Sequence, residues 1–140
     1  MKHNLLFIII FLSTLFINKS FASDNTRLFP GDPIIDKIIA CLKTQDARCV
    51  GQYFANNIEM TLLSSKGNYS RSQAVALLDN FFVKHPLKSI SNVKSGELSD
   101  NKIYVVGNYN SGSITYKIYF ILFKEINQIA PQILIFNITK

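Results

Sequence analysis

The stretch that most constrains the fold runs from residue 113 to residue 125 and reads SITYKIYFILFKE. Its even-numbered positions, from Ile114 to Leu122, are all apolar, which is typical of a strand with one face covered by a core. The odd-numbered positions begin polar, with Thr115 and Lys117, and then become apolar at Tyr119, Ile121 and Phe123. The second face is therefore covered over only half its length. A ligand pocket, a subunit contact or another packed element would each explain this, and the sequence leaves the three open.

The N-terminus has the three-part layout of a secretory signal peptide: a charged start at Lys2, an apolar run over Leu5–Ile17, and a small residue, Ala22, at its end. Thirteen residues would span about 20 Å as a helix, against about 30 Å of bilayer hydrocarbon. We therefore interpret residues 1–22 as a signal peptide cleaved before Ser23. The protein is expected to be exported, periplasmic or secreted, with no stable membrane insertion after cleavage.

The remaining chain has a length that suits a single domain. We expect a lead-in segment over residues 23–32 and one domain over residues 33–140. Without Lys2 and Lys19, 13 basic and 9 acidic side chains remain, a net charge of +4. Because the basic residues are spread along the chain, no nucleic-acid partner is expected.

Two cysteines, Cys41 and Cys49, lie eight residues apart in the mature chain. In an exported domain a disulfide can persist, and a helix break between the two residues could bring them together. Buried free thiols are the alternative, and the sequence leaves both open. His85 is the only histidine after the signal peptide, so no metal site is expected.

Three helices are predicted from capping residues and apolar spacing, over residues 33–43, 47–54 and 71–84. Alternating patterns predict strands over residues 57–63, 87–97, 102–109 and 133–138, in addition to the stretch at 113–125. Turns are predicted at residues 64–68 and 110–112. This order of elements predicts an α+β fold in which N-terminal helices pack on a curved, mostly antiparallel sheet.

The order is also that of the nuclear-transport-factor-2-like (NTF2-like) cone. Local phrases give a closer likeness: the chain resembles a family of exported bacterial proteins, found mainly in the Bacteroidetes, known as domain of unknown function 4783. The phrases that carry it are Asp46-Ala47 leading to Tyr53-Phe54, Glu59-Met60-Thr61-Leu62, Gly67-Asn68-Tyr69-Ser70 leading to Gln73-Ala74, Phe81-Phe82 with Pro86, and Tyr116-Lys117-Ile118-Tyr119-Phe120. The resemblance implies the NTF2-like fold and brings no known reaction with it.

Candidate catalytic residues are few. NTF2-like enzymes, by resemblance, hold carboxylates, tyrosines or a histidine in their pockets, and here Glu59 and Asp79 are the candidate carboxylates. Each is better explained as a solvated surface residue, because burying an unpaired charge is costly. The chain has no Gly-x-Ser-x-Gly turn, glycine-rich phosphate loop or cluster of metal ligands. We interpret the domain as non-catalytic and expect no cofactor, with a small hydrolase or isomerase using Glu59 or Asp79 as the alternative.

Aromatic side chains are more numerous, and a subset of them in a cone mouth could bind a small apolar or aromatic molecule. The candidate pocket residues are Tyr53, Phe54, Met60, Phe81, Phe82, Tyr104, Tyr116 and Phe120. The predicted function is therefore binding of a small apolar ligand or of a partner protein.

A second candidate surface is the outer side of the sheet. Large apolar residues that alternate with core positions would form an exposed patch, which soluble proteins usually cover. The residues predicted for this patch are Tyr119, Ile121 and Phe123 on one strand, and Leu134, Phe136 and Ile138 on the last strand. NTF2-like proteins commonly dimerise through this surface, so the resemblance also points to a homodimer, or to a hetero-complex that uses the same patch.

The export hypothesis predicts a mature protein that begins at Ser23. Intact-mass measurement of periplasmic material should give the mass of residues 23–140. A chain that retains the first 22 residues and sediments with membranes would contradict the hypothesis.

Overall fold

The structure is a computed structural model that describes residues 31–140. The predicted signal peptide, and the lead-in segment as far as residue 30, lie outside the described residues. Within residues 31–140, no helix is long and apolar enough to cross a membrane.

Helices α1 (Pro33–Lys43) and α3 (Arg71–Lys84) begin where capping residues were predicted. The Asp32 carboxylate accepts a hydrogen bond from the first turn of α1 at 3.0 Å. Ser70 and Gln73 form a complete capping box at the start of α3. Both helices present an apolar face to the sheet, because buried side chains recur along them at helical spacing.

Helix α2 (Ala47–Gly51) is shorter than the predicted helix over residues 47–54. The chain joins the sheet earlier than its helical pattern indicates, because the Tyr53 carbonyl accepts a hydrogen bond from the backbone N–H of Ile133. A disulfide joins Cys41 of α1 to Cys49 of α2. The loop between the two helices is therefore closed covalently.

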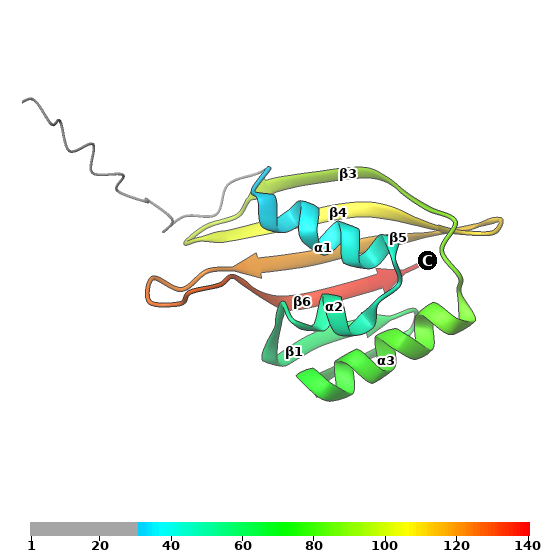
Figure 1. The fold of residues 1–140 in the computed structure, drawn as a ribbon, viewed down its shortest axis with the longest axis horizontal. Coiled ribbons are helices and arrows are strands. Elements are labelled where there is room, and N and C mark those ends of the chain that lie inside the picture. The colour runs from blue at the N-terminus through cyan, green and yellow to red at the C-terminus, as the bar shows by residue number, and fades with distance from the viewer. Residues whose placement is uncertain (1–30) are drawn as a thin grey trace, which may run out of the picture.

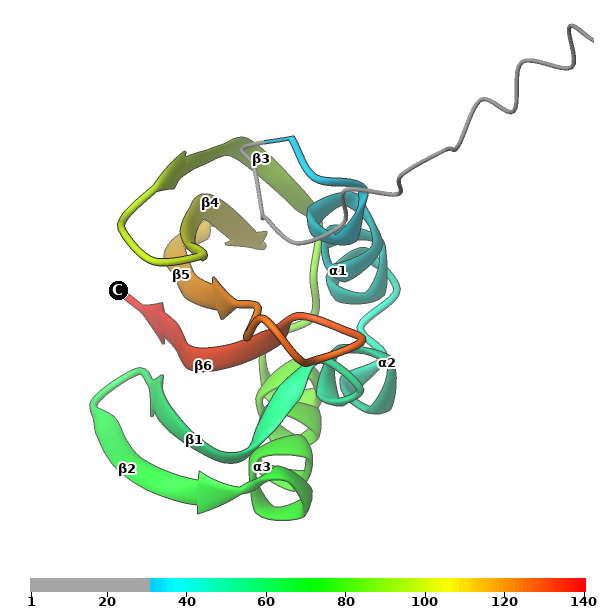
Figure 2. The same cartoon turned by 90° about the vertical axis from the view of Figure 1, so that its left-hand side faces the viewer.

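The sheet has six strands in the order β2-β1-β6-β5-β4-β3. All neighbours are antiparallel except β1 and β6, which are parallel. The sheet is curved and does not close, and Figure 2, which looks nearly along the strands, shows the three helices on one side of it (Figures 1 and 2). The strands are β1 (Phe54–Leu62), β2 (Ser65–Ser70), β3 (Ser89–Glu97), β4 (Lys102–Ser111), β5 (Ile114–Phe123) and β6 (Gln132–Thr139). The predicted α+β architecture is confirmed.

Strand β2 replaces the turn that was predicted over residues 64–68. It pairs with β1 along its whole length, and the chain reverses at Leu63, which has a φ of 58°. Gly67 lies against the ring of Tyr69, where a Cβ atom would come within 2.8 Å of the ring. The prediction was wrong because backbone pairing at a sheet edge needs no apolar side chains, and this strand has few of them.

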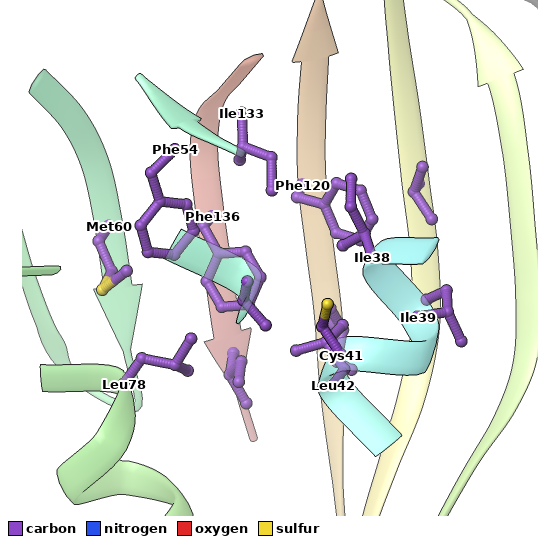
Figure 3. Packing of buried hydrophobic residues seen from close by; sticks show 14 of the residues in the cluster. Ile38, Ile39, Cys41, Leu42, Phe54, Met60, Leu78, Phe120, Ile133 and Phe136 are labelled. Carbon is purple, nitrogen blue, oxygen red and sulfur yellow. The ribbon is translucent and has the colours of Figure 1, made fainter. Parts of the chain in front are cut away.

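The core lies between the helices and the inner face of the sheet. Figure 3 shows Phe120 and Phe136 of the sheet facing Ile38 and Leu42 of α1. The rings of Phe120 and Phe136 are stacked with 6.1 Å between centroids, and Phe54 lies 5.6 Å from Phe136. One continuous core therefore joins β1, β6, β5 and α1.

The sequence pattern predicted Phe136 and Ile138 on the outer side of the sheet, and this prediction was wrong. Both side chains are fully buried on the inner face rather than on the outer side of the sheet. Leu122 pairs with Ile133 but Ile121 pairs with Ile135, so Leu134 is an extra residue in β6. Such a bulge reverses the alternation that follows it.

The disulfide should stabilise the domain by restricting its unfolded chain. A loop of this length predicts a contribution of about 2 to 3 kcal/mol to the free energy of unfolding. Urea unfolding of the oxidised protein and of the same protein reduced with dithiothreitol measures it. Equal unfolding midpoints, or two reactive thiols in denatured protein that was never reduced, would contradict this assignment.

Candidate functional site

The predicted pocket residues lie in three places. Six of them are buried in the core: Phe54, Met60, Phe81, Phe82, Tyr116 and Phe120. Tyr53 is half-buried at the margin of the core, and Tyr104 lies on the outer face of the sheet, opposite Gly96 of β3. The structure therefore does not bring all eight residues together.

At the C-terminal end of α3 the interior is filled by aromatic rings. Phe81 lies 5.5 Å from Tyr109 and 5.7 Å from Tyr116, in edge-to-face arrangements. Phe82 is stacked on Tyr109 with 6.2 Å between centroids. These contacts belong to the preferred geometries of aromatic pairs, so this end of the core is packed by the protein's own side chains.

A polar network closes the same end. The Tyr109 hydroxyl donates to the His85 carbonyl and accepts from the Gln45 amide, whose nitrogen lies 3.0 Å away. The Tyr116 hydroxyl and His85 Nδ1 share a hydrogen bond of 3.0 Å. Burial raises the pKa of Tyr109 to about 12, against the lowering effect of the Gln45 hydrogen bond. Gln45 reaches this network from the loop that the disulfide closes, where it has a φ of 52°.

Gln45 and Tyr109 were not among the predicted pocket residues. A signal for Tyr109 is present in the sequence, because it alternates with the apolar inner positions Ile103 and Val105 of β4. A tyrosine on a buried face needs a partner for its hydroxyl. Nothing local indicates that Gln45 is that partner, since 64 residues separate the two.

The outer face of the sheet carries rows of side chains that the strand register places side by side. One row runs from Val106 to Tyr119, and the next from Tyr104 through Ile121 to Ile135. Phe123 follows beside them on β5, and Lys102 lies over its ring at 5.7 Å. We call Tyr104, Val106, Tyr119, Ile121, Phe123 and Ile135 the apolar stripe. Each of its six side chains is half-buried.

The other half of the outer face is polar. The Lys117 ammonium donates to Asn108 Oδ1 at 2.9 Å, and the Thr115 hydroxyl donates to Asn110 Oδ1 at 2.9 Å. Asn110 in turn donates to the Ser91 hydroxyl oxygen at 3.1 Å. The outer face thus changes from a hydrogen-bonded polar half, near the β4–β5 turn, to the apolar stripe at the opposite end. This division follows the change from polar to apolar residues along β5.

The two candidate carboxylates lie on different surfaces. Glu59 is on the outer side of β1 and forms an ion pair with Lys66 at 2.9 Å. Asp79 is exposed on α3, on the helical side. The two cannot act on one substrate as an acid and base pair. Within residues 31–140, no three potential metal-ligating side chains are grouped.

Three helices on one face of an unclosed, curved mixed sheet define the NTF2-like class of fold. The chain belongs to the family described as Domain of unknown function (DUF4783), whose model matches residues 35–138. Comparison with curated proteins gives no match.

Solved structures agree with this assignment. A DUF4783 family protein from Bacteroides ovatus is 20% identical, with a TM-score of 0.66 over 74% of this chain and 92% of that one. The NTF2-like design named Rd1NTF2_05 with long sheet is 12% identical, with a TM-score of 0.61 over 76% of this chain and 93% of that one. A putative calcium/calmodulin dependent protein kinase II association domain from Xanthomonas campestris is 15% identical, with a TM-score of 0.55 over 76% and 81%. At these identities the likeness is one of fold.

The Tyr109 network predicts a specific pH dependence. The folded protein keeps the Tyr109 proton up to about pH 12, whereas the unfolded chain loses it near pH 10, so stability should fall as the pH rises between these values. The Tyr109→Phe variant should not show this loss of stability, because it has no hydroxyl to titrate. At neutral pH it should cost about 1 to 3 kcal/mol, because the His85 carbonyl loses this donor and the Gln45 amide retains only its hydrogen bond to the Phe82 carbonyl.

Urea unfolding of both proteins between pH 7 and pH 12 measures these effects. Tyr104→Phe, in the same strand but on the outer face, is the matched control and should change the stability at pH 7 by less than about 0.5 kcal/mol. An unchanged pH dependence in Tyr109→Phe would show that the hydroxyl is not held in the buried network.

Proposed function

We propose that this protein is exported and acts as a non-catalytic association domain, which binds a second copy of itself through the apolar stripe. The observation that carries the proposal is the placement of six large apolar or aromatic side chains on a sheet face that no helix covers in the described part of the chain. Soluble proteins rarely leave such a group of residues in contact with water.

The packing of the interior favours this role over a small-ligand pocket. Six of the eight predicted pocket residues are core side chains, and aromatic rings and the Tyr109 network occupy the end of the core beside α3. A ligand there would have to displace packed rings, which is costly. The hydrolase or isomerase alternative loses support for a related reason: neither Glu59 nor Asp79 lies in that interior.

A second copy fits the stripe because a twofold contact needs only one self-complementary patch. Strand β5 lies between β4 and β6, with β3 and β1 as the next strands outward. A twofold axis along β5 would place β3 of one copy over β1 of the other. Lys94 of one copy would then lie opposite the edge of the partner's sheet that carries the Glu59–Lys66 ion pair, so these charged side chains would lie at the margins of the contact and the apolar stripe at its centre.

The comparison with known structures supports association in general terms. The protein from Xanthomonas campestris, which has a similar fold, is described as a putative association domain. The fold therefore accommodates that kind of role, and the apolar stripe is the surface of this chain that is suited to it.

The proposal predicts a concentration-dependent dimer. Sedimentation velocity from about 5 to about 500 μM should show the mass rising from one chain to two. Ile121→Lys should raise the dissociation constant at least about tenfold, because it places a charge at the centre of the contact.

The matched control is Val83→Lys, which makes the same kind of change at an α3 side chain that is 74% exposed. It should leave the dissociation constant unchanged. A wild-type protein that stays monomeric throughout, or an Ile121→Lys variant that dimerises like the wild type, would contradict the proposal.

A further inference from the structure

The helical side of the domain carries a cleft between α2 and α3, on the side of the sheet opposite the apolar stripe. It consists of two adjoining hollows of about 560 and 600 Å³, and both are lined by Arg48, Ser72 and Val75. We call these two hollows together the α2–α3 cleft. None of its lining residues belongs to the apolar stripe.

A close contact between the two helices forms the floor of the cleft. A Cβ atom on Gly51 would lie 2.2 Å from Cγ2 of Val75, so only glycine allows α2 to approach α3 this closely. Val75 lines both hollows, and its side chain is half-buried. The floor is therefore apolar, while polar and charged side chains surround it.

The two hollows differ in charge. One is lined by Arg48 and Arg71 and by no acidic residue. The other shares Arg48 and adds Asp46 and Asp79. Asp79 follows Arg71 by eight residues of α3, so the basic and acidic ends are about 12 Å apart along the helix axis.

The arginines have no carboxylate partner in the described chain. Within residues 31–140 the only ion pair joins Lys66 to Glu59. Arg71 Nε is buried and makes no hydrogen bond with the protein. A ligand could not reach this enclosed nitrogen, so it would contact Arg71 through the terminal nitrogens of the guanidinium group.

We propose that the α2–α3 cleft binds short peptides with free termini. The peptide carboxylate would lie between Arg48 and Arg71, since guanidinium groups match a carboxylate in geometry and charge. The peptide ammonium group would lie at Asp79, with Asp46 beside it. An extended chain spans about 3.3 to 3.6 Å per residue, so three or four residues cover the distance and a free amino acid does not.

Titration calorimetry with the tripeptide Ala-Ala-Ala tests this proposal, with N-acetylated and C-amidated forms of the same peptide and free alanine as comparison ligands. The free tripeptide should bind saturably, and each blocked form at least about tenfold more weakly, because each lacks one charged end. Arg71→Gln and Asp79→Asn should each weaken binding of the free tripeptide to a similar extent.

Combining the protein variants with the blocked peptides distinguishes binding in the cleft from non-specific electrostatic attraction. Arg71→Gln should not further weaken the C-amidated peptide, and Asp79→Asn should not further weaken the N-acetylated one. Lys84→Gln, also on α3 but outside the cleft lining, makes the same charge change as Arg71→Gln and should leave all affinities unchanged. Unfolding curves of the variants confirm that each is folded.

Three results would overturn the proposal: no saturable binding up to about 10 mM peptide, equal affinity for free and blocked peptides, or equal weakening by Lys84→Gln and Arg71→Gln. Dimerisation measured on the same samples is expected to be unaffected by all three variants. Failure of peptide binding can therefore be distinguished from failure of dimerisation.

Discussion

Phe120 stacks on Phe136 at the middle of the inner face, and this contact ties β5 to β6 where α1 covers the sheet. It depends on β5 keeping strict alternation, which turns Ile118, Phe120 and Leu122 toward the helices. The same alternation turns Ile121, with its neighbours in the apolar stripe, toward the outside. One strand thus supplies both the centre of the core and the surface that we assign to association.

The end of the core beside α3 is held by longer connections. The disulfide closes the α1–α2 loop, and Gln45 from that loop reaches the Tyr109 hydroxyl. Tyr109 also binds the His85 carbonyl at the end of α3. The α1–α2 loop, the end of α3 and the sheet therefore meet at one buried hydroxyl, which explains why this end is packed rather than open to a ligand. This end of the core therefore contributes to stability in this chain.

Capping residues and the spacing of apolar side chains were sufficient to predict much of this fold. The capping residues located α1 and α3, and the alternation along β5 indicated its two faces. The faces of β6 were not predictable, because the extra residue Leu134 reverses the alternation and has no local signal. Tyr104 was placed in the pocket although it lies five residues from Tyr109, an odd spacing that puts the two on opposite faces of β4. The α2–α3 cleft depends on the contact between Gly51 and Val75, which no periodicity shows.

We thus propose that the protein associates through the outer face of its sheet, while its own side chains fill the interior. Isotope-filtered nuclear Overhauser spectroscopy on an equal mixture of labelled and unlabelled chains would detect such an association at the level of single residues. Contacts between copies are expected at the methyl groups of Ile121 and Ile135, and none at those of the buried Ile118 and Leu122. An absence of contacts between copies at millimolar concentration, or contacts confined to the helical side, would contradict it.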